Sequence, residues 1–152
     1  MKNIILFVSA WIIFIGCKNS DKPHDDSEIT NKTKFTWVAA FNDSTGKFEV
    51  IKKDNTGPDS VNVNSLIAYL NETNTNVLLN LIKLSGDTIY LSIPDAEYLT
   101  QQMGSSGPIN YFATVVYNLT EISGIKFVNF DFDLGDHASP GVYSRESFKN
   151  EF

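Results

Sequence analysis

The sequence has very little cysteine and histidine, and its apolar runs are short. It contains one cysteine, Cys17, and two histidines, of which only His137 lies in the region expected to fold. A lone cysteine can form neither an internal disulfide nor a cysteine-based metal site. The apolar run over residues 4–15 is well short of the roughly 20 residues that a membrane-spanning helix needs. The chain is therefore expected to have no disulfide and no transmembrane anchor.

Basic residues are also scarce. Lysine and arginine total 12 against 18 aspartates and glutamates, which gives a net charge of −6. Lysines and arginines form no cluster along the sequence. An acidic surface repels phosphate backbones, so nucleic acid is excluded as a partner.

Recognisable catalytic motifs are missing as well. A nucleophilic triad needs a base beside the nucleophile, and His137 is the one histidine available for that role. The sequence contains no G-x-S-x-G, no H-E-x-x-H and no glycine-rich phosphate loop before a helix. We therefore expect a non-enzymatic protein without a cofactor.

The N-terminus has the pattern of a secretion signal. Lys2 precedes the apolar run, as in the charged start and apolar middle of a signal peptide. The run ends in Phe14-Ile15-Gly16-Cys17, which resembles the lipobox of bacterial lipoproteins, although leucine is usual where Phe14 stands. The resemblance implies cleavage after Gly16, a diacylglycerol on the Cys17 thiol and acylation of the new amine. The alternative is an ordinary cleaved signal with an incidental cysteine.

The region after the signal divides into a tether and a domain. Residues 17–34 are almost entirely polar or charged, and Ile29 is their one aliphatic residue, so this acidic segment cannot bury enough apolar surface to fold. Residues 35–152 are enough for a single globular domain. Lys18 replaces the aspartate that resembles an inner-membrane retention signal. We therefore expect a lipid anchor in the cell envelope, at the outer membrane if the host has one.

The sequence of the domain predicts an α+β fold. Aromatic and β-branched runs around turn residues predict two hairpins and a final strand, and a 3.6-residue period predicts two helices. Pro108 marks the start of the second helix and Gly124 its C-terminal cap. The order β-β-α-β-β-α-β predicts a mixed sheet of about five strands with both helices on one face. The expected strands cover 35–41, 48–51, 77–84, 88–93 and 125–133, and the helices begin at Asn62 and Pro108.

A family resemblance covers most of this domain. Gly86-Asp87 precedes an alternating strand, a helix ends in Leu119-Thr120-Glu121, and Gly124 leads to a short strand with Val128-Asn129-Phe130. This pattern is similar to the GerMN domain of sporulation and spore-germination lipoproteins. The family's usual Leu-X-Gly-Pro after the first helix is replaced by Asn71-Glu72-Thr73-Asn74. The resemblance implies an adaptor that binds protein and has no catalytic motif.

One segment contains the candidate binding residues. Acidic, imidazole, phenol and guanidinium groups follow the last predicted strand, and loops at strand ends often hold sites. Its carboxylates and imidazole could bind a hard divalent cation. The alternative is that Gly135 and Pro140-Gly141 turn the chain back while Tyr143 and Phe148 cover a sheet edge. The candidates are Asp131, Asp133, Asp136, His137, Tyr143 and Arg145.

Two functions follow from these patterns. The first is an envelope interaction or assembly module that binds another protein or a surface polymer through a sheet edge or the helix-free face. The second is a lipoprotein that binds a small ligand or a divalent metal. The first predicts an exposed apolar patch or an open edge strand, and the second a concave aromatic pocket around Trp37, Tyr90 or Tyr111.

Overall fold

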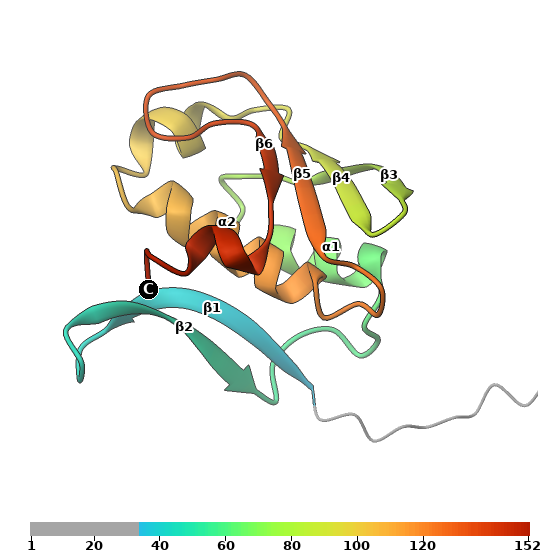
Figure 1. The fold of residues 1–152 in the computed structure, drawn as a ribbon, viewed down its shortest axis with the longest axis horizontal. Helices are drawn as coiled ribbons and strands as arrows, with labels where there is room; N and C mark the ends of the chain where they lie inside the picture. Colours follow the sequence, from blue (N-terminus) through green and yellow to red (C-terminus); the bar gives the residue numbers. More distant parts are fainter. Residues whose placement is uncertain (1–33) are drawn as a thin grey trace, which may run out of the picture. The chain divides into compact units, whose positions relative to one another are not determined.

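The computed structural model describes residues 34–152, which belong to one compact unit. The predicted signal peptide, Cys17 and nearly all of the predicted tether lie outside the described residues. The α+β class is confirmed, with two α-helices, a four-stranded mixed sheet and a two-stranded sheet (Figure 1). The elements are β1 (Phe35–Asn42), β2 (Lys47–Asp54), α1 (Val63–Thr73), β3 (Asn80–Ser85), β4 (Thr88–Ser92), η1 (Tyr98–Gln102), α2 (Gly107–Leu119), β5 (Phe127–Asp131), β6 (Gly141–Tyr143) and η2 (Arg145–Phe148).

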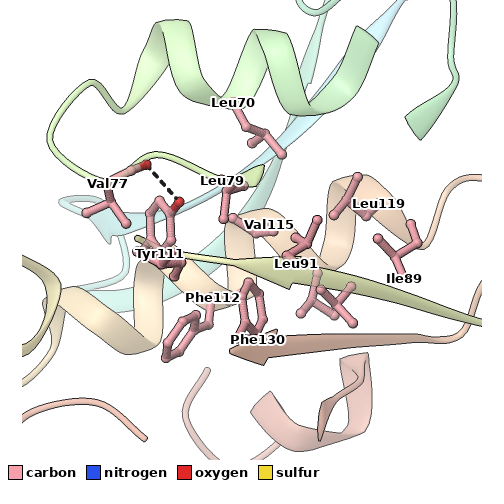
Figure 2. Close-up of a cluster of buried hydrophobic side chains, with 14 of the residues drawn as sticks. Leu70, Val77, Leu79, Ile89, Leu91, Tyr111, Phe112, Val115, Leu119 and Phe130 are labelled. Atoms are coloured by element: carbon pink, nitrogen blue, oxygen red, sulfur yellow. Dashed lines mark hydrogen bonds between the residues drawn. The ribbon is translucent and has the colours of Figure 1, made fainter. Parts of the chain in front are cut away.

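The four-stranded sheet has the order β3-β4-β5-β6. The central pair, β4 and β5, is parallel, and both outer pairs are antiparallel. Ile89 and Leu91 of β4 and Val128 and Phe130 of β5 alternate with more exposed neighbours, so one face of the sheet is buried. Figure 2 shows Ile89, Leu91 and Phe130 among side chains of α1 and α2. Together with Val128 they belong to one hydrophobic cluster.

Helix α1 begins one residue after the predicted start, with Asn62 as its N-cap. The Asn62 carboxamide oxygen accepts from the Ser65 amide at 3.0 Å, and the Ser65 hydroxyl oxygen accepts from the Asn62 amide at 3.2 Å. This reciprocal capping box satisfies two backbone donors at the start of the helix. Leu66, Ile67 and Leu70 form the buried face that the 3.6-residue period indicates.

The prediction of a single sheet of about five strands is wrong, because the hairpin β1–β2 forms a separate sheet. Its β1 edge faces α2, and in Figure 1 the helix lies between the hairpin and the four-stranded sheet. The Asn118 amide accepts from the Trp37 N–H at 3.0 Å and donates to the Trp37 carbonyl at 2.7 Å. The Thr114 hydroxyl oxygen accepts from the Ala39 N–H at 2.9 Å. Helix side chains thus take the place that a neighbouring strand would have on β1.

The C-terminal third differs from the prediction in two further ways. Helix α2 ends at Leu119, and Gly124 lies beyond it in a turn, with a φ of +84° that favours glycine. The sequence pattern also missed the π-helix η1, strand β6 and the short 3₁₀ helix η2. These elements have three to five residues each, too few to show a period.

Candidate functional site

The structure does not bring the six candidate residues of the 131–145 segment together. Asp136, His137 and Tyr143 line a cavity of about 320 Å³ between the start of α2, the loop before β6 and η2. Asp131 lies at the end of β5, paired in register with Ser92, and its side chain is exposed. Asp133 is exposed in the following loop.

Tyr143 has a structural position in this cavity. Its ring lies 5.0 Å from that of Phe112 and stacks on that of Phe148, with an interplanar angle of 14°. Its hydroxyl donates to the Ser139 carbonyl at 2.7 Å, and burial raises the pKa of the phenol. Tyr143 and Phe148 therefore pack against the core at the β6 edge, as the alternative interpretation of this segment expects.

The geometry gives no support to a metal centre in this segment. Among residues 34–152, no three histidine, cysteine, aspartate or glutamate side chains lie close enough to hold a metal ion. Asp136 and His137 share the cavity, but Asp131 and Asp133 do not line it.

Arg145 connects three elements of the fold. Its guanidinium donates to the Thr120 hydroxyl at 2.8 Å, to the Tyr117 carbonyl at 2.9 Å and to the Glu121 carboxylate at 2.5 Å. The indole N–H of Trp37 donates to the same carboxylate at 3.0 Å. Arg145 thus ties η2 to the end of α2 and to β1, which is a structural role.

An open edge strand is the feature expected of a protein-binding module. Three of the four sheet edges in the described region are protected from pairing with another chain. The β1 edge is closed by Thr114 and Asn118 of α2. Strand β2 has five charged residues among its eight, and charged side chains discourage strand addition. Strand β6 has only three residues and follows Pro140. Short edge strands and proline both discourage pairing with another chain.

Strand β3 is the fourth edge, and its protection of this kind is limited to Lys83 and a register shift between Leu81 and Lys83. All six of its residues are exposed, and its sequence, NLIKLS, has Lys83 as its one charge. Ile82 is 51% exposed, Leu84 is 54% exposed, and Leu78 just before the strand is 50% exposed. Exposed apolar side chains on an open edge strand form a template for pairing with another chain. We call Leu78 and residues 80–85 the β3 edge.

The register shows how the β3 edge relates to the core. Leu81 and Leu84 lie opposite the buried Leu91 and Ile89 of β4. The apolar face that the helices cover on β4 therefore continues onto β3, where it is left open. Lys83 lies opposite Tyr90, with its ammonium 4.7 Å from the ring centroid.

Leu81, Ile82 and Leu84 are not among the predicted functional residues, because 77–84 has the apolar run of an ordinary hairpin strand. A signal was present, because the apolar residues Leu78-Leu79 and Leu81-Ile82 do not alternate with polar residues as in a half-buried strand. In the structure the register against β4 shifts between Leu81 and Lys83, so this strand does not follow a strict period of two.

Comparison of the chain with protein-family models, with curated proteins and with solved structures finds no match. Within residues 34–152, no helix is long and apolar enough to cross a bilayer.

Proposed function

We propose that this chain is a lipid-anchored envelope protein whose GerMN-like domain binds another polypeptide by strand addition to the β3 edge. The domain acts as a non-enzymatic interaction or assembly module. The lipid on Cys17 holds it at the membrane, and residues 18–34 connect the lipid to the domain.

One observation carries the binding proposal: β3 is an apolar edge left open in a domain whose other edges are closed, charged or short. An extended peptide pairing with β3 gains main-chain hydrogen bonds, and its alternate side chains gain apolar contacts. Those side chains continue the row formed by Leu81 and Leu84.

The one charge on β3 indicates one chemical feature of the partner. Lys83 is the single charged residue of β3, so a carboxylate near it on the incoming strand completes an ion pair. The partner is therefore an extended segment with alternating apolar residues and an acidic residue at one outward position.

Site-specific photo-crosslinking in the producing cell tests this proposal. A photoreactive amino acid at position 82, on the β3 edge, is compared with one at position 142 on β6, because Val142 is also exposed, at 58%. We expect a defined partner to crosslink from position 82 and not from position 142. Hydrogen exchange of the purified complex should show new protection of β3 amides.

A lysine substitution on the β3 edge tests the same proposal through the affinity of the complex. Ile82→Lys should weaken the purified complex at least about tenfold, whereas Val142→Lys should leave it unchanged. Both sites are exposed, so each variant should stay within about 0.5 kcal/mol of the parent stability. Equal crosslinking from both positions, or a complex that tolerates Ile82→Lys, would show that β3 is not the binding edge. If the crosslinked partner is a second copy of this chain, the domain assembles with itself.

A further inference from the structure

A cleft of about 370 Å³ lies between β1, α1 and α2 and is separate from the β3 edge. Val38 and Ala39 of β1 form one wall, and Leu70 and its neighbours on the last turns of α1 form another. Helix α2 contributes Asn110 and Thr114. The volume is near the lower end of the range for cavities that bind small molecules.

The lining of this cleft carries no charge. Every residue that lines it is apolar, aromatic, an amide, a hydroxyl or glycine, although one fifth of the chain's residues are charged. A charged ligand would lose its hydration there without gaining an ion pair, which is costly. The cleft therefore favours a neutral ligand.

Hydrogen-bonding groups lie on two of its walls. In the described part of the chain, the side-chain amide of Asn110 and the Tyr69 hydroxyl make no hydrogen bond, so both can bond a ligand in the cleft. The Thr114 hydroxyl oxygen accepts from Ala39, which leaves its own proton to donate. Asn118 cannot donate to a ligand, because both of its side-chain amide protons are bound by the Trp37 and Thr114 carbonyls.

Apolar surface separates these polar groups. Val38, Leu70 and Met103 contribute aliphatic and thioether atoms, and Tyr69 and Tyr111 lie along the walls. A ligand that fits this lining is neutral, has several hydroxyl or amide groups, and has apolar C–H faces between them. We propose that the cleft binds a neutral saccharide of one or two rings.

The test uses the full chain in a zwitterionic detergent, because a detergent with a sugar head group would compete. Glucose, galactose, mannose, N-acetylglucosamine and maltose are titrated by NMR or calorimetry, with glucuronic acid and glucosamine as charged counterparts. We expect saturable binding of at least one neutral sugar, with resonance shifts confined to the cleft residues. The charged counterparts should bind at least about tenfold more weakly, because the cleft offers no ion pair.

Asn110→Asp is the informative variant, because it keeps the shape of the side chain and adds a charge. An acid in the first turn of α2 suits the helix dipole, so this variant should fold. It should weaken sugar binding at least about tenfold, and Tyr69→Phe should weaken it by about three- to tenfold. Asn129→Asp, on the half-exposed helix-free face of β5, is the matched control and should not alter binding.

Three results would overturn the proposal. The first is that no neutral sugar binds at concentrations up to about 50 mM, which corresponds to a negligible affinity. The second is that binding survives Asn110→Asp unchanged, and the third is that glucuronic acid binds as well as the neutral sugars. Each of these outcomes is independent of strand addition at β3.

Discussion

At the scale of single residues, Tyr111 shows how one buried polar group is accommodated. Its side chain is 4% exposed, and its hydroxyl donates to the Val77 carbonyl at 3.1 Å, the dashed contact in Figure 2. Burial raises the pKa of this phenol above its ordinary value of 10.0. The folded state therefore keeps the proton at a pH at which the unfolded chain has lost it.

This pKa shift predicts a loss of stability at alkaline pH. Above about pH 10 the unfolded state binds fewer protons than the folded state, so the free energy of unfolding falls by up to about 1.4 kcal/mol per pH unit from this residue alone. Tyr111→Phe removes this loss, but at pH 7 it costs about 1 kcal/mol by leaving the Val77 carbonyl without its donor. Urea unfolding of both proteins at pH 7 and pH 11 checks the prediction. A stability difference that stays constant between the two pH values would contradict it.

At the scale of elements, the two side-chain contacts between α2 and β1 hold the N-terminal hairpin. Asn118 is 2% exposed, and its replacement by alanine leaves both the N–H and the carbonyl of Trp37 without partners. We expect Asn118→Ala to lower the free energy of unfolding by about 2 to 4 kcal/mol. Asn118→Asp keeps the acceptor for the Trp37 N–H, but it loses the donor contacts to the Trp37 and Thr114 carbonyls and places a carboxylate beside them.

Chemical denaturation and hydrogen exchange at the Trp37 amide measure this effect. The exchange rate of that amide should rise in Asn118→Ala and rise less in Asn118→Asp, which keeps the acceptor for it. Asn129→Ala on the helix-free sheet face is the control, with a change within about 0.5 kcal/mol. A hairpin that keeps its protection in Asn118→Ala would mean that apolar packing alone holds it.

These elements also show what the sequence could and could not predict. The spacing of Leu66, Ile67 and Leu70 places α1 to within one residue at each end, because helix amphipathicity is a local property. The end of α2 was misplaced because Ile122 continues the apolar pattern past Leu119 into the turn. The assignment of β1 and β2 to a second sheet depends on Asn118 and Thr114. They look like isolated polar positions in an apolar helix, and their partners lie 75 or more residues away.

The candidate site was less predictable than the fold. The 131–145 segment drew attention through its residue types, but Arg145 bonds to α2 and Tyr143 packs on the core. The openness of β3 depends on which strand ends the sheet, and neighbours along the sequence do not determine that. A strand of the same composition in the middle of the sheet would be an ordinary core strand.

At the scale of the whole molecule, the proposed anchor makes a separate prediction. The chain as produced should enter the detergent-rich phase in Triton X-114 partitioning, and its intact mass should show acyl chains on a chain that begins at Cys17. Cys17→Ser should remain in the aqueous phase. Because the residues of the β3 edge and of the cleft all lie between positions 37 and 118, the soluble form should keep both proposed binding activities. A wild-type chain found in the aqueous phase would contradict the lipid anchor.

The contact between α2 and β1 has a geometric limit. Four residues of α-helix advance about 6.0 Å, whereas two residues of antiparallel strand advance about 6.8 Å. The steps from Asn118 to Thr114 and from Trp37 to Ala39 therefore differ by about 0.8 Å, which hydrogen bonds tolerate. At the next step, from Thr114 to Asn110 and from Ala39 to Phe41, the accumulated difference is about 1.6 Å. A helix can close only a short length of a strand edge, and the first side chain beyond that length, Asn110, lines the cleft without a hydrogen bond to β1.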